Sequence, residues 1–284
     1  MNRQSIGDLT LNVVQRGPAA GPRILLLHGF PESHAAWAEV ADRLAARGRR
    51  VITPDLRGYG ASDAPQGIAA YALDRLAQDI VALADANGVA RFDLVGHDWG
   101  GIVAWAVAGR APDRVRRLVA MAAPHPDVMG PAMRRHPRQI VRSLYIGFFQ
   151  LPWLPEALLR ARDYRLLRRS LAKTSRPGTF DAVKLATYVQ SWRGRLTTML
   201  NYYRALRVRR APIGRIAMPS LILWGAGDRF LSVELARASA AMCDDARLMV
   251  RDDATHWLHH EEPAWVAETI AGFCEDGARP TAAA

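Results

Sequence analysis

The sequence FDLVGHDWGG, residues 92–101, joins an apolar run at 92–95 to a helical segment at 99–110. Glycines stand on both sides of Asp98, which lies at the junction. A strand that turns directly into a helix crowds the neighbours of the turn, so only small residues fit there. The segment therefore predicts that Asp98 projects from a tight strand-to-helix turn.

A carboxylate at such a turn favours chemistry at saturated carbon. It is ionised at pH 7 and can displace a leaving group, which forms an ester. Hydrolysis of that ester requires a base, an acid that orients the base, and an oxyanion hole. The simpler alternative is that Asp98 caps the helix that follows it.

Two later residues are candidates for the acid and the base. Asp228 follows the apolar run 220–224, and His256 follows the run 247–250. Because the carboxyl ends of parallel strands meet at one edge of a sheet, we expect Asp98, Asp228 and His256 to converge there. Alternatively, Asp228 is a turn residue and His259 or His260 is the base, although both histidines lie close to the start of the next predicted helix.

The sequence HGFP, residues 28–31, follows another apolar run at 24–27. In this position a second oxyanion-hole amide is expected. The donors would be the backbone N–H groups of Phe30 and Trp99. A glycine-rich loop, GYGAS at 58–62, follows the next predicted strand.

Short apolar runs and helical segments alternate along most of the chain. The predicted strands are 24–27, 51–53, 92–95, 118–121, 220–224 and 247–250, and the predicted helices are 34–47, 73–87, 99–110, 233–243 and 263–273. Several runs are apolar throughout, which is typical of strands buried on both faces of a parallel sheet. The pattern predicts an α/β fold with a mostly parallel central sheet flanked by helices.

Residues 130–215 interrupt the alternation with helical periodicity and a strong basic bias. They hold 19 Lys and Arg against three acidic residues, a net charge of +16, whereas the rest of the chain carries −5. We expect a core of residues 1–129 and 216–284 with an inserted helical cap, 130–215, over the carboxyl ends of the strands, where ligands bind. The basic cap is either a solvated helical face or a surface that favours acidic lipid substrates or anionic membranes.

Composition limits the class of protein. The chain has 284 residues, 50% hydrophobic and 23% charged, which is typical of a soluble globular protein. Without an apolar run near the roughly 20 residues needed to span a bilayer, and with only the widely spaced Cys243 and Cys274, it is predicted to be cytoplasmic. No metal-ligand spacing, cofactor motif or nucleic-acid motif is recognised. We expect a monomer or homodimer, and a tail at 279–284 that frays.

Taken together, these motifs resemble the epoxide hydrolase branch of the α/β-hydrolase fold, from His28 to about Pro263. That branch carries HGxP, matched by residues 28–31, and G-x-Sm-x-S/T, where Sm is a small residue, matched by 58–62. Its nucleophile motif matches 96–101. The resemblance implies that Asp98 opens an epoxide to an alkyl-enzyme ester, which water activated by His256 and Asp228 hydrolyses to a vicinal diol, without a cofactor.

The resemblance also implies two tyrosines in the cap that hold the epoxide oxygen. Tyr145 lies four residues before FQLP at 149–152, and Tyr203 lies inside NYYR at 201–204. Ring opening generates an alkoxide, a far stronger base than a phenolate, so phenols can donate to it. Tyr202 or Tyr164 are alternative donors, and any of the four can instead pack the cap. A small hydrophobic epoxide would contact the following apolar and aromatic side chains: Phe30, Trp99, Phe149, Trp153 and Tyr202.

Two other activities and one non-catalytic role remain open. Haloalkane dehalogenases resemble this chain in the Asp nucleophile and in Trp99, but they usually carry Asn where Phe30 stands. Fluoroacetate-type dehalogenases match Phe30 but typically have Arg at the position of Trp99. A pure binding role is also considered, since fold alone does not determine function.

Overall fold

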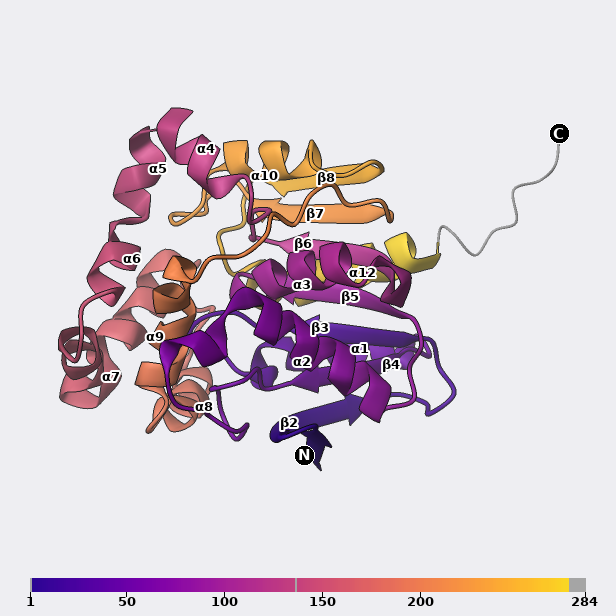
Figure 1. The fold of residues 1–284 in the computed structure, drawn as a ribbon, viewed down its shortest axis with the longest axis horizontal. Coiled ribbons are helices and arrows are strands. Elements are labelled where there is room, and N and C mark those ends of the chain that lie inside the picture. The colour runs from indigo at the N-terminus through magenta and orange to yellow at the C-terminus, as the bar shows by residue number, and fades with distance from the viewer. Residues whose placement is uncertain (1, 136, 276–284) are drawn as a thin grey trace, which may run out of the picture.

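The computed structural model describes residues 2–135 and 137–275 (Figure 1). Its centre is an eight-stranded sheet in the order β1-β2-β4-β3-β5-β6-β7-β8. The strands are β1 (Asn2–Ile6), β2 (Leu9–Arg16), β3 (Arg23–Leu27), β4 (Arg50–Pro54), β5 (Phe92–His97), β6 (Val115–Met121), β7 (Ser220–Gly225) and β8 (Ala246–Arg251). From β4 to β8 all neighbouring strands are parallel, which confirms the predicted sheet. The predicted tail at 279–284 lies outside the described residues.

The antiparallel β1 and β2 are two strands that the sequence reading missed. They pair with each other, and β2 then pairs antiparallel with β4. Gly7, with a φ of 68°, forms the turn between them. Their alternating pattern places Leu9, Leu11 and Val13 in the core, but period-two alternation in a polar segment is a weaker signal than an apolar run.

Helices cover both faces of the sheet. On one face, α1 (Ala38–Ala46) packs against α12 (Pro263–Glu275), while α2 (Leu73–Ala86) and α3 (Trp99–Arg110) pack together on the other. The helix α10 (Val233–Ala240) joins the second group, and the short α11 (Leu258–Glu261) precedes α12. The 3-10 helices are η1 (His34–Trp37), η2 (Ile68–Tyr71), η3 (Pro112–Arg114) and η4 (Ala205–Arg207).

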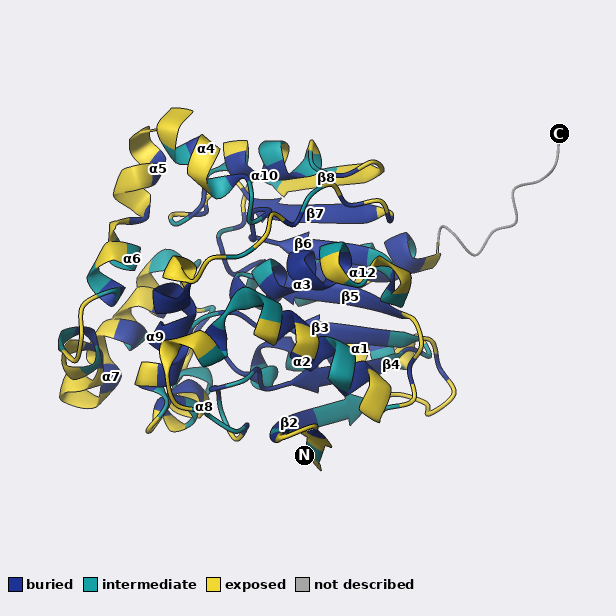
Figure 2. Cartoon of the chain, viewed as in Figure 1, coloured by how far each residue is buried: buried dark blue, intermediate teal, exposed yellow. Residues whose placement is uncertain are grey.

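Between β6 and β7 the described residues form six α-helices, here called the insert, followed by η4. They are α4 (Met129–Arg135), α5 (Pro137–Arg142), α6 (Leu144–Phe149), α7 (Leu154–Thr174), α8 (Ala182–Trp192) and α9 (Leu196–Arg204). The insert lies beyond one end of the strands, with α9 inside and much of α5 and α7 exposed (Figures 1 and 2). In α7 the helical geometry breaks at residues 161–164. Whether the insert is a separate domain with the bounds 130–215 stays a prediction.

Within residues 2–135 and 137–275, no helix combines the length and the apolar character needed to cross a bilayer. Cys243 and Cys274 are both buried free thiols.

Candidate active site

Asp98 lies at the turn between β5 and α3. Its backbone has a φ of 48° and a ψ of −120°, an uncommon conformation for a residue with a side chain. A Cβ on Gly96 would overlap the backbone of Gly100, and one on Gly100 would overlap the backbone carbonyl oxygens of Leu27 and His28. The glycines beside Asp98 therefore permit the close approach of β5, α3 and the end of β3.

His256 lies between the Asp98 carboxylate and a second aspartate, Asp228. His256 Nε2 is 3.6 Å from Asp98 Oδ2, and His256 Nδ1 is 2.7 Å from Asp228 Oδ2. The other oxygen of Asp228 accepts hydrogen bonds from the backbone N–H groups of Phe230 and Leu231, at 2.8 and 2.9 Å. The structure thus brings the three predicted triad residues together, with both sides of the imidazole facing a carboxylate.

This arrangement favours a charged His256 in the free protein. Burial by itself would lower the pKa of His256, but the paired Asp228 and the nearby Asp98 outweigh it and raise the pKa to about 10. In the ground state, an imidazolium ion therefore lies between two carboxylates.

The backbone of Phe30 supplies a donor at the same point. Its N–H donates to Asp98 Oδ1 at 2.8 Å. The Trp99 amide follows Asp98 directly and begins α3, where the first N–H groups of a helix lack partners within the helix. The Phe30 N–H therefore contacts the Asp98 carboxyl group, while the role of the Trp99 amide in an oxyanion hole stays a prediction.

Tyr145 on α6 and Tyr203 on α9 face the same carboxylate from the insert. Their ring centroids are 5.8 Å apart, and the ring of Tyr203 lies edge-on to those of Phe30 and Trp99 at 5.3 and 5.1 Å. Burial raises the pKa of both phenols, and the negative charge of Asp98 raises it further. Both hydroxyls therefore stay protonated and able to donate near neutral pH.

The two alternative tyrosines are engaged elsewhere. The Tyr202 hydroxyl donates to the backbone carbonyl of Arg57 at 2.8 Å. Tyr164 is buried against Trp192, with ring centroids 5.6 Å apart.

Two cavities meet at Asp98, Tyr145 and Tyr203. The first, of about 210 Å³, is also lined by Trp99 on α3, by Tyr202 on α9, and by Met129, Met133 and Leu206. The second, of about 270 Å³, is also lined by Phe30, Phe149, Leu159, Phe230, His256 and Trp257. Apart from a few polar groups, the linings are apolar and aromatic, which suits an apolar ligand of small or medium size.

One expected lining residue lies outside this site. Trp153 begins the exposed end of α7, with a φ of 48° and 73% of its surface exposed, and it lines neither of these two cavities. The break between α6 and α7 turns its side chain outward, which the composition of the segment alone does not reveal. Phe30, Trp99, Phe149 and Tyr202 each line one of the cavities.

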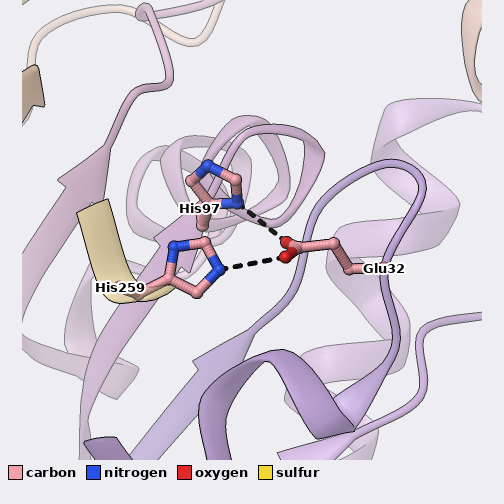
Figure 3. Close-up of side chains that lie close together, drawn as sticks. All are labelled: Glu32, His97 and His259. Atoms are coloured by element: carbon pink, nitrogen blue, oxygen red, sulfur yellow. Dashed lines mark hydrogen bonds and ion pairs between the residues drawn. The ribbon is translucent and has the colours of Figure 1, made fainter. Parts of the chain in front are cut away.

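A buried carboxylate, Glu32, lies against His97 and His259 (Figure 3). Its oxygens contact His97 Nδ1, His259 Nε2 and His260 Nε2 at 3.0, 3.1 and 2.7 Å. Burial would raise the pKa of Glu32, but these histidines outweigh it and hold the pKa well below its usual value. The other nitrogen of His97 lies 2.9 Å from the backbone oxygen of His256. His259 and His260 thus contact Glu32 and do not replace His256 beside Asp98.

Glu32, His97 and His259 could in principle hold a metal ion, since their ligand atoms lie within 4.8 Å of one another. Tetrahedral zinc with ligands at about 2.1 Å separates them by about 3.4 Å. The contacts to Glu32 are 2.7–3.1 Å, which are direct hydrogen bonds. Glu32 is therefore a hydrogen-bonded carboxylate, and through His97 it holds the backbone of His256 in place.

Two residues that the sequence reading passed over also shape the site. Arg142 on α5 donates to the backbone oxygen of Asp228 at 3.0 Å, and the ring of Phe230 lies between His256 and Tyr145, at 5.2 and 5.9 Å. Phe230 follows Asp228 closely enough to be suspected. Arg142 is one arginine among many in a basic segment, so the sequence carries no signal that distinguishes it.

Comparison with known proteins agrees with this geometry. Residues 22–263 match the model of the alpha/beta hydrolase fold family. The chain belongs to the α/β-hydrolase fold family. Among the family's curated members, the AB hydrolase superfamily protein YfhM of Bacillus subtilis is 40% identical over 94% of this chain and 95% of its own length. Human epoxide hydrolase 4 is 35% identical over 95% of this chain and 77% of its own length.

Solved α/β-hydrolase structures give the same picture. The epoxide hydrolase of Bacillus megaterium in complex with an inhibitor superposes with a TM-score of 0.89 at 26% identity, covering 96% of this chain and all of that one. The family assignment and the predicted fold class are thereby confirmed, and the family contains hydrolases with this sheet.

Proposed function

We propose that this chain is an epoxide hydrolase that forms a covalent ester on Asp98. The observation that carries the proposal is that one ionised carboxylate and two phenol groups, Tyr145 and Tyr203, line the same two apolar cavities. Relatives named epoxide hydrolases, 30–35% identical to the chain, support the reaction class. Ring opening needs a nucleophile on one side of a C–O bond and proton donors on the other.

In the first step, an Asp98 oxygen attacks one ring carbon while the bond from that carbon to the epoxide oxygen breaks. The electron pair of that bond passes to oxygen, which takes a proton from Tyr145 or Tyr203. The phenolate left behind is stabilised by the other hydroxyl and recovers its proton from solvent. The product is a 2-hydroxyalkyl ester of Asp98.

In the second step, His256 removes a proton from water and the resulting hydroxide attacks the ester carbonyl carbon. The Phe30 N–H, 2.8 Å from an oxygen of this carboxyl group, stabilises the oxyanion together with the Trp99 amide. Collapse of the tetrahedral intermediate releases the diol and returns Asp98 as a carboxylate. Asp228 holds the imidazole and offsets its positive charge.

Ester formation itself converts His256 into a base. In the free protein, Asp98 contributes to the raised pKa of about 10. Alkylation removes the negative charge of Asp98, so the pKa of His256 falls, although Asp228 still raises it. The imidazole can therefore release its proton more readily in the intermediate that requires a base.

The alternative activity, haloalkane dehalogenation, would use the same carboxylate and histidine with Trp99 as a halide donor. It leaves Tyr145 and Tyr203 without a chemical role, because a departing halide needs no proton. We therefore prefer the epoxide.

The test has two arms. The wild-type protein is given a styrene-type epoxide, a fatty epoxide and a bromoalkane, and both diol and bromide are measured; diol without bromide is expected. The His256→Gln variant is then mixed with the epoxide that turns over best, and the Asp98 peptide is weighed by mass spectrometry. A gain equal to the epoxide mass on that peptide is expected, whereas bromide release or an adduct elsewhere would refute the proposal.

A further inference from the structure

The outer surface of the insert combines exposed apolar side chains with arginine. Seven of the thirteen exposed large apolar residues among the described parts of the chain fall within residues 140–166, so they are concentrated on a single segment. The most exposed of these seven are Val141, Leu144 and Trp153, at 67, 63 and 73%. Exposed apolar side chains gathered in this way mark an interaction surface more often than an ordinary solvated face.

The same helices carry positive charge with little compensation. Arg134, Arg138, Arg162, Arg165 and Arg169 are exposed. The acidic residues of 129–174 are Glu156, which pairs with Arg204, and Asp163, which pairs with Arg168. Helices α4 to α7 follow one another along one edge of the molecule, and much of their outer side is exposed (Figures 1 and 2). We call the exposed side chains of residues 134–169 the arginine face.

We propose that the arginine face binds the surface of an anionic lipid bilayer. Guanidinium groups pair with lipid phosphates, while Leu, Val and Trp side chains enter the boundary between headgroups and acyl chains. Tryptophan is enriched at that boundary. The helical geometry of α7 is interrupted at residues 161–164. Both halves of α7 can therefore contact the bilayer without forming one continuous amphipathic helix.

Charge argues against the other occupants. Two copies of the arginine face would repel each other, because both carry uncompensated arginine. A nucleic acid would satisfy the guanidinium groups but would leave Val141, Leu144 and Trp153 in water. An anionic bilayer offers negative charge and hydrocarbon together.

The bilayer would also lie beside the site. Arg142, Leu166 and Ser170 belong to the same helices and line the second cavity. If the proposed function holds, an apolar epoxide dissolved in the lipid reaches this cavity from the membrane side. Membrane binding itself does not depend on the reaction, so the two proposals can fail separately.

The test uses the full-length protein with sedimented vesicles of phosphatidylcholine, with or without phosphatidylglycerol. We expect binding at least tenfold tighter to the anionic vesicles at low salt and a marked loss at high salt. The double variant Val141→Ser/Trp153→Ser should bind at least fivefold more weakly. The control Val183→Ser, on α8 and 75% exposed, should bind like the wild type. All variants should keep wild-type turnover of a water-soluble epoxide.

Four results would overturn the membrane proposal. The first is equal binding to both kinds of vesicle, and the second is an equal loss in the Val183 control. The third is binding to inorganic polyphosphate or DNA that matches vesicle binding and is unaffected by the double variant, because the arginines would then bind phosphate alone. A dimer seen by sedimentation velocity that the double variant dissociates would assign the face to a second copy instead.

Discussion

The Arg142 guanidinium donates a 3.0 Å hydrogen bond to the backbone carbonyl of Asp228, 86 residues further along the chain. This bond ties the insert to the loop that orients His256. The position of the His256 imidazole therefore depends on a residue of the insert.

Removal of this bond should slow the reaction without unfolding the protein. We expect Arg142→Ala to lower kcat/KM about fivefold, the equivalent of one hydrogen bond worth about 1 kcal/mol. Arg138→Ala, one turn earlier on α5, is the matched control and should leave kcat/KM unchanged. Equal effects of the two substitutions would show that only the general charge of α5 matters.

The tyrosine hydroxyls should act in ring opening alone. Tyr203→Phe and Tyr145→Phe should each slow formation of the Asp98 ester by about 10²-fold, the typical effect of removing one donor to a developing oxyanion. Hydrolysis of the ester should keep its rate. Both steps can be followed in single turnovers by quenching and mass spectrometry.

Tyr202→Phe is the control for this pair, because its hydroxyl donates to the carbonyl of Arg57. It should cost about 1 kcal/mol of stability and leave the rate of ring opening unchanged. A Tyr203→Phe variant in which only ester hydrolysis slowed would count against Tyr203 as a donor.

The pKa of His256 should respond to the charge of Asp98. In the wild-type protein the imidazole should titrate near pH 10, since two carboxylates stabilise its charged form. In Asp98→Asn one of those charges is gone, so the titration should move to lower pH. The measurement is the NMR titration of the His256 Cε1 proton, and an unchanged or higher pKa in the variant would contradict the proposed conversion of His256 into a base.

The glycines beside Asp98 should tolerate no side chain. Gly100→Ala places a Cβ against the carbonyl oxygens of Leu27 and His28, and should lower the free energy of unfolding by at least about 3 kcal/mol. Gly272→Ala is the control, because no described atom outside the neighbouring backbone of α12 lies within 4 Å of its added Cβ; it should stabilise α12 by about 0.5–1 kcal/mol. Denaturant unfolding compares the two, and similar stabilities would argue against crowding at the turn.

Short stretches of sequence were enough to predict those parts of the site that depend on local backbone geometry. The glycines around Asp98 mark the turn, and the positions of Asp98, Asp228 and His256 after β5, β7 and β8 place all three at the carboxyl edge of the sheet. Tyr145 and Tyr203 were found by resemblance, since nothing in helical periodicity separates them from Tyr202.

The features that escaped prediction depend on contacts between distant segments. Glu32 follows β3, whereas His259 and His260 follow β8, and these residues meet although three strands separate β3 from β8 in the sheet. The outward position of Trp153 depends on a break between two helices, and β1 becomes a strand because β2 is there to pair with it. None of these is encoded in a short stretch of residues.

Because two cavities meet at Asp98, an epoxide bound as proposed would hold its ring at the junction and direct its two ring carbons towards different cavities. The substituent on one ring carbon would extend towards Met133 and Leu206, and the substituent on the other towards Leu159 and Trp257. Shape selection then acts on the two halves of the substrate independently. A change of volume on one side alters which ring carbon faces the carboxylate, and so the handedness of the diol, while every reacting group stays in place.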